Sequence, residues 1–138
     1  MKINPYVMFN RQCGEAFPFY GTVLGGTVEV LTHSQSPMAD QVPADWRNLV
    51  MHGMLTAGDL VLMGADECPP ENYQPMQGCA ITLNLDDPAE TDRIFNTFAE
   101  GGNVISPLQE TFFAQKFGLL IDRFGVQWMF VCICQVES

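Results

Sequence analysis

The sequence predicts an α+β fold of two βαβββ modules that pair into a half-open, barrel-like cup. Three observations support this prediction. The 138 residues contain the order strand, helix and three strands twice, judged by hydrophobic spacing. A glycine pair ends each helical segment, at Gly25-Gly26 and at Gly101-Gly102. A shift of 76 residues superposes these two pairs, and a shift of 67 places Gly58 on Gly125.

The first predicted module spans residues 1–66. It begins with a strand over residues 3–9 and a helix over residues 14–24, in which Pro18 predicts a kink or a start near residue 17. The polar, proline-bearing stretch 32–43 indicates an exposed loop. The remaining strands are expected over residues 27–31, 49–55 and 60–63, the last two joined by a hairpin turn at residues 56–59.

Residues 67–77 are rich in Pro, Asn and Glu and are predicted to link the modules. The second module then spans residues 78–136. Its helix begins at Asp87-Pro88, because aspartate is a favourable N-cap and proline suits the first turn. Its strands are expected over residues 79–85, 103–105, 117–121 and 126–134, the last two joined by residues 122–125.

The composition limits the partners of this protein. A hydrophobic fraction of 47% with 16% charged residues can form a sizeable apolar core. The net charge of −10 disfavours nucleic acids and anionic membranes and would attract a cationic ligand. No signal peptide is recognisable, and no apolar run reaches the roughly 18–20 residues that span a bilayer. The five scattered cysteines form no CxxC pair, so we expect a cytoplasmic protein with free thiols.

Six segments of the chain carry a family resemblance: NPYVMFN (4–10), EAFPFYGTVLGG (15–26), VMHGML (50–55), LVLMGAD (60–66), FNTFAEGGNVISPLQETFF (95–113) and FGVQWMF (124–130). They resemble PhnB-like proteins of the vicinal-oxygen-chelate superfamily, which also contains glyoxalases, ring-cleaving dioxygenases and bleomycin- or fosfomycin-resistance proteins. The resemblance covers about residues 3–134 and implies the glyoxalase/bleomycin-resistance fold, a homodimer and a small-molecule ligand. Some PhnB-like chains carry a methyltransferase label, but no glycine-rich nucleotide loop follows the first strand here.

The resemblance also indicates where metal ligands would lie. In the metal-dependent glyoxalases, His and Glu ligands come from the first and last strand of each module. The corresponding positions here fall near Pro5, Cys79, Leu62 or Met63, and Met129, none of which is His, Asp or Glu. The sequence therefore predicts no metal ligands and no cofactor. A divalent metal stays open as an alternative, because an alignment shift of two residues would change these positions.

Two residues are candidate catalytic groups. His52 lies within an apolar strand, either as a core histidine or as an acid/base group lining the cleft; the hairpin places it on the face of Met63 and opposite Leu62. Glu110 follows Leu108 and precedes two phenylalanines, so it is either a proton-transfer group or an exposed carboxylate capping a turn. Candidate substrate-binding residues, for which core packing is the alternative, are Gln109, Phe112, Trp128, Met129 and Met63.

Three functions remain open at this point. The first is an enzyme, or former enzyme, that binds and transforms a small molecule in the cleft between the modules without a metal. The second is a bleomycin-resistance-like protein that sequesters a bulky or cationic compound. The third is a metal-dependent glyoxalase-like lyase or dioxygenase whose ligands lie at other positions.

Overall fold

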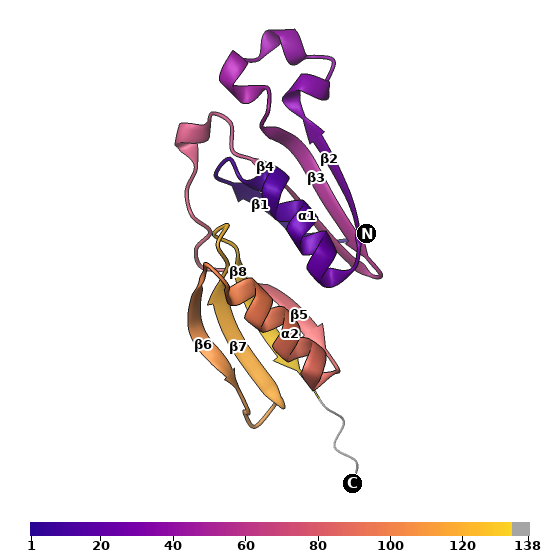
Figure 1. Cartoon of the computed structure of the whole chain (residues 1–138), viewed down its shortest axis with the longest axis vertical. Coiled ribbons are helices and arrows are strands. Elements are labelled where there is room, and N and C mark those ends of the chain that lie inside the picture. The colour runs from indigo at the N-terminus through magenta and orange to yellow at the C-terminus, as the bar shows by residue number, and fades with distance from the viewer. Residues whose placement is uncertain (134–138) are drawn as a thin grey trace. The chain divides into compact units, whose positions relative to one another are not determined.

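The computed structural model describes residues 1–133, and the chain divides between Pro75 and Met76 into two compact units. Each unit contains one helix and one sheet of four strands (Figure 1). The division falls within the segment 67–77 that the sequence marks as a linker.

The first unit contains β1 (Tyr6–Phe9), α1 (Cys13–Leu24), β2 (Thr27–Thr32), β3 (Val50–Ala57) and β4 (Leu60–Asp66). The strand order in its sheet is β1-β4-β3-β2, with β1 and β4 parallel and the other neighbours antiparallel. The predicted turn between β3 and β4 is confirmed. The predicted loop after β2 contains two short 3₁₀ turns, at His33–Gln35 and Ala39–Gln41, and a third follows it at Ala44–Trp46.

The start of the first strand and the start of the helix differ from the prediction. The first strand begins at Tyr6 rather than residue 3, because its pairing with β4 starts where Met63 N donates to the carbonyl of Pro5. The helix begins at Cys13, one residue before the predicted start at residue 14, and it continues through Pro18, so the alternative start near residue 17 is wrong. Asp66 accepts a hydrogen bond from Cys13 N at 2.9 Å, so a residue 53 positions away stabilises the helix start.

The second unit contains β5 (Ile81–Leu85), α2 (Pro88–Ala99), β6 (Asn103–Gln109), β7 (Lys116–Ile121) and β8 (Gln127–Cys132). Its strand order, β5-β8-β7-β6, repeats that of the first unit. Asp87 caps α2 as predicted, accepting from Ala89 N at 3.0 Å. Strand β5 starts two residues later than expected, since Cys79 is exposed and unpaired with β8, and β6 continues to Gln109 across two register shifts. Cys134, included in the predicted last strand, lies outside the described residues.

The glycine pairs perform the same role in both units, which confirms the predicted duplication of βαβββ order. Gly25 and Gly101 adopt left-handed backbone, with φ of 76° and 73°, and reverse the chain after each helix. A Cβ on Gly26 would lie 2.5 Å from Thr56 O, and one on Gly102 would lie 2.3 Å from Ile121 O. Only glycine therefore allows the neighbouring strand to pass this closely.

The strand register corrects one detail of the repeat. Tyr6 lies opposite Met63, and Thr82 lies opposite Met129. Because Tyr6 and Thr82 are equivalent under the shift of 76, the last strands superpose with a shift of 66 rather than 67. The two turns also differ in length, since β3 and β4 are joined by two residues and β7 and β8 by five, so Gly58 and Gly125 do not occupy equivalent positions.

Each helix packs on one face of its own sheet, and that face forms the core of the unit (Figure 1). In the first unit, Phe17 of α1 packs edge-on against Phe9 at 5.8 Å, over the space left by Gly53 and Gly64. In the second, Phe98 of α2 packs against Trp128 at 4.9 Å. Within residues 1–133, the opposite face of each sheet is not covered by the α-helix of its own unit. We call these the first and second open faces.

None of the helices in residues 1–133 has the length and apolar character required to cross a lipid bilayer.

Candidate functional site

The first open face is rich in methionine and includes one carboxylate, Glu29, which is the cross-strand partner of Met54. Gly53 and Gly64 face α1. Because successive residues of a strand point to opposite faces of the sheet, the residues next to these two glycines lie on the first open face. Flexible thioether side chains can adapt to ligands of different shape, and methionine is frequent on surfaces that bind varied partners. The residues of this face that concern ligand binding are Tyr6, Met8, Leu31, His52, Met54 and Met63.

Tyr6 and His52 form a polar pair on this surface. The Tyr6 hydroxyl lies 3.2 Å from Nδ1 of His52, and the two rings are 5.7 Å apart. Tyr6 is 47% exposed and His52 is half-buried, so both are accessible. Partial burial raises the pKa of Tyr6, which keeps the phenol neutral near pH 7.

His52 lies on the same face as Met63, as the hairpin spacing predicts. Met54, two residues from His52, is the cross-strand partner of Met63, whereas Leu62 and Leu55 form the adjacent pair on the helix face. This placement favours the open-face alternative for His52 over a core histidine. Tyr6 was not among the predicted site residues, although it directly follows Pro5 at the start of the first strand.

The residues at the predicted ligand positions do not fit the metal of the metal-dependent relatives. The predicted last-strand positions include Met63 and Met129, and their partners on the first strands are Tyr6 and Thr82. A phenol, a hydroxyl and two thioethers lack the imidazole and carboxylate donors of such sites. Within residues 1–133, no three His, Cys, Asp or Glu side chains are grouped to hold an ion. We derive no metal-dependent step.

The second open face contains Met129 together with Phe117 and Leu119. Trp128 points the other way, toward α2, and is 1% exposed. Its Nε1 donates to Asp122 Oδ2 at 2.9 Å inside the core. This position favours the core alternative for Trp128.

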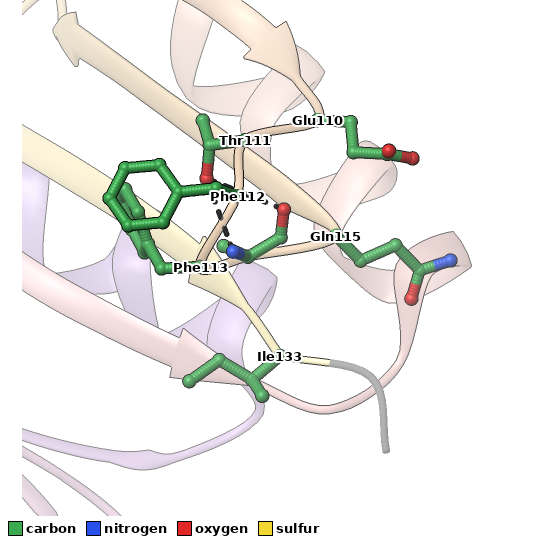
Figure 2. A pocket seen from close by; sticks show the side chains of 7 residues that line it. Glu110, Thr111, Phe112, Phe113, Gln115 and Ile133 are labelled. Carbon is green, nitrogen blue, oxygen red and sulfur yellow. Dashed lines mark hydrogen bonds between the residues drawn. The ribbon is translucent and has the colours of Figure 1, made fainter. Parts of the chain in front are cut away.

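The turn between β6 and β7 surrounds a hollow of about 380 Å³, bordered by residues 110–115 and Ile133. Figure 2 shows that Glu110 points away from the rings of Phe112 and Phe113. Leu108 lies toward α2, near Gly118, so it does not enclose the carboxylate. This geometry favours the exposed-carboxylate alternative for Glu110. Gln109, at the end of β6, is likewise exposed.

Phenylalanines extend from the same turn onto the second open face. Phe112 is fully exposed and its ring lies 5.2 Å from that of Phe113, which in turn lies 5.4 Å from Phe117. Of the predicted site residues, His52 and Met63 lie on the same face of the sheet in the first unit. Gln109, Glu110, Phe112 and Met129 all belong to the second unit.

Comparison with solved structures defines the class of fold. PA1353 of Pseudomonas aeruginosa is 46% identical, covers 98% of this chain and 99% of its own, and has a TM-score of 0.89. A Bacillus cereus PhnB protein, described as a candidate 3-demethylubiquinone-9 3-methyltransferase, is 24% identical with 96% and 99% coverage and a TM-score of 0.77. A glyoxalase/bleomycin resistance protein/dioxygenase family enzyme of Burkholderia phytofirmans PsJN is 13% identical, with 95% of both chains covered and a TM-score of 0.63. The chain thus has the glyoxalase/bleomycin-resistance fold.

The family follows from the sequence itself. The model of the 3-demethylubiquinone-9 3-methyltransferase family matches residues 1–131. This chain belongs to that family, and the PhnB-like resemblance is confirmed.

Proposed function

We propose that this protein binds a small, largely apolar molecule on its first open face and holds one polar group of that molecule at the Tyr6–His52 pair. The hydrogen bond between these two side chains, on an accessible methionine-rich surface, is the observation that supports the proposal. Small-molecule sites generally combine an apolar lining with a few convergent polar groups.

The pair also suits a proton transfer. When His52 is neutral with its proton on Nε2, Nδ1 accepts from the Tyr6 hydroxyl and Nε2 is left to donate to a ligand. The raised pKa of Tyr6 opposes loss of its own proton. Tyr6 therefore orients the imidazole, and His52 is the group that gives or takes a proton. Glu110, which is exposed at the turn between β6 and β7, is given no part in this proposal.

Binding of the neutral, polyaromatic dye Nile red tests the apolar part of the proposal. Met54→Gln, on the first open face, should weaken binding about fivefold or more, because roughly 1 kcal/mol of apolar contact is lost. Met38→Gln is the matched control, since Met38 is exposed in the loop after β2. Equal affinities of the two variants would contradict binding on this face.

The polar part is tested with Tyr6→Phe and His52→Gln on the same dye, which carries one carbonyl acceptor. Each change should cost about fivefold in affinity, corresponding to one hydrogen bond of about 1 kcal/mol. Where a substrate is turned over, His52→Gln should abolish turnover, while Glu110→Gln should leave it unchanged. Loss of turnover in Glu110→Gln alone would move the proton-transfer role to that residue.

A sequestering function is the second candidate, and the net charge of −10 favours it. A bulky cationic compound such as bleomycin should then bind without product formation. Its affinity should fall as salt rises from low to physiological ionic strength, because charge attraction is screened. Salt-independent binding would argue against this candidate.

We do not propose methyl transfer from the family name. The residues between β1 and α1 are Asn10, Arg11 and Gln12, and no glycine-rich nucleotide loop opens the helix.

A further inference from the structure

One row of side chains crosses the first open face from the edge strand β1 to the edge strand β2. Tyr6 of β1 pairs with Met63 of β4. Met54 of β3 pairs with Met63 on one side and with Glu29 of β2 on the other. Residues that pair across neighbouring strands lie on the same face of a sheet. The two methionines therefore separate a phenol at one edge from a carboxylate at the other.

Glu29 has no counter-ion among the residues that the structure describes. Its side chain is exposed, and the strands β1, β2, β3 and β4 contain no lysine or arginine. Within residues 1–133, the Glu29 carboxylate forms no ion pair and accepts no hydrogen bond. The carboxylate is therefore accessible to a cation from solution.

The second sheet shows that the fold does not need a charge at this place. The corresponding row of the second open face consists of Thr82, Met129, Leu119 and Ser106. Ser106 of the edge strand β6 thus takes the place that Glu29 has on β2. An uncharged side chain fits the same strand pairing, so the pairing does not account for the carboxylate of Glu29.

Glu29 also lies close to the Tyr6–His52 pair. His52 pairs with Leu31, and Glu29 lies two residues before Leu31 on the same strand. Diagonal neighbours of this kind in an antiparallel pair have Cα atoms roughly 7–8 Å apart. This separation is within the length of a small organic molecule. One ligand can therefore contact both His52 and Glu29, with its apolar part on Met54.

We infer that Glu29 selects the ligand class of the first open face, which is an apolar molecule that carries a protonated amine or a related organic cation. The cation lies beside the Glu29 carboxylate, the apolar part lies on Met54 and Met63, and the polar group lies at His52. This inference rests on the proposed function and adds the residue that discriminates between ligands. It differs from attraction by the net charge of −10, because a single residue carries the preference.

The experiment compares two dyes that share one fused ring system, neutral Nile red and positively charged Nile blue, by fluorescence titration at low ionic strength. Glu29→Gln should weaken Nile blue binding about three- to fivefold, because an exposed ion pair is lost. The affinity for Nile red should change by less than about twofold, since glutamine retains the size of the side chain. At about 1 M salt the effect on Nile blue should disappear, because the charges are screened.

Glu15→Gln is the matched control. Glu15 is exposed on α1, which packs on the opposite face of the same sheet, and its replacement changes the net charge by the same amount. This variant should leave Nile blue binding unchanged. Equal effects of Glu29→Gln and Glu15→Gln on Nile blue would overturn the inference. An equal loss of affinity for both dyes in Glu29→Gln would also overturn it, because packing rather than charge would then be responsible.

Met54→Gln separates the failure of this inference from the failure of the proposed function. If this variant binds both dyes as tightly as the unchanged protein, the ligand does not lie on the first open face and both proposals are wrong. If it weakens both dyes while Glu29→Gln and Glu15→Gln act alike, only the selection of a cation is wrong. Urea unfolding of each variant separates loss of the site from loss of the fold.

Discussion

Asp122 shows how one buried side chain organises a turn. Its carboxylate accepts from Phe124 N at 2.9 Å, from Val126 N at 3.0 Å and from Trp128 Nε1 at 2.9 Å. Asp122→Asn replaces one acceptor oxygen by an NH₂ donor, so at least one buried N–H loses its partner. We expect unfolding free energy in urea to fall by about 2–3 kcal/mol. The exposed Asp40→Asn should leave it unchanged, and equal midpoints for the two would contradict the assignment.

The buried thiol of Cys13 should lower the free energy of unfolding at high pH. Burial, with a smaller effect of Asp66, raises the pKa of this thiol in the folded state. The unfolded thiol ionises first, so the folded state gains nothing from Cys13 below about pH 8.5 and loses stability as pH rises above that value, by up to about 1.4 kcal/mol per pH unit. Urea unfolding between pH 8 and pH 10 measures this slope. Cys13→Ala should reduce it, and an identical slope in the variant would disprove the role.

At the scale of elements, the close approach of β7 to Gly102 leaves no space for a side chain at that position. Gly102→Ala would place a Cβ 2.3 Å from Ile121 O, so it should destabilise the second unit by about 1–3 kcal/mol. Gly14→Ala is the matched control, because a Cβ there meets only Val50 at an ordinary 3.5 Å within α1. That control should be neutral or stabilising by up to about 1 kcal/mol. Urea unfolding distinguishes the two signs.

The two helices show which sequence patterns were sufficient to predict where an element begins or ends. The Gly-Gly pairs and the Asp87-Pro88 start predicted where α1 ends and where α2 begins, because these features act through local backbone geometry. The start of α1 was not predictable in this way. Its first N–H is bonded by Asp66, which lies on β4, and no local pattern indicates that contact.

At the scale of the whole molecule, we expect the chain to form a homodimer. Phe112 is fully exposed, and Val104 and Ile105 are exposed on the edge strand β6. Exposed apolar side chains and edge strands of this kind usually contact another protein surface, and a second copy of the chain would supply that surface. Light scattering at micromolar concentration should give twice the 15.3 kDa mass of one chain. A mass of one chain would contradict the dimer.

Phe112→Ser tests where that contact lies. The substitution removes an exposed side chain and should not lower stability. If the turn between β6 and β7 takes part in the dimer, the variant should dissociate at higher concentrations than the unchanged protein. An unchanged dissociation curve would exclude Phe112 from the contact.

The sequence by itself determined the order of the elements, their duplication and the hairpin spacing that places His52 with Met63. These depend on local backbone preference and on the two-residue period of strands. Only the tertiary structure decided that Tyr6 lies beside His52, that Trp128 faces a helix and that Cys68 meets His33. For the two pairs in the first unit, the reason is strand order: the arrangement β1-β4-β3-β2 brings together residues up to 46 positions apart, and no local pattern records which strands become neighbours.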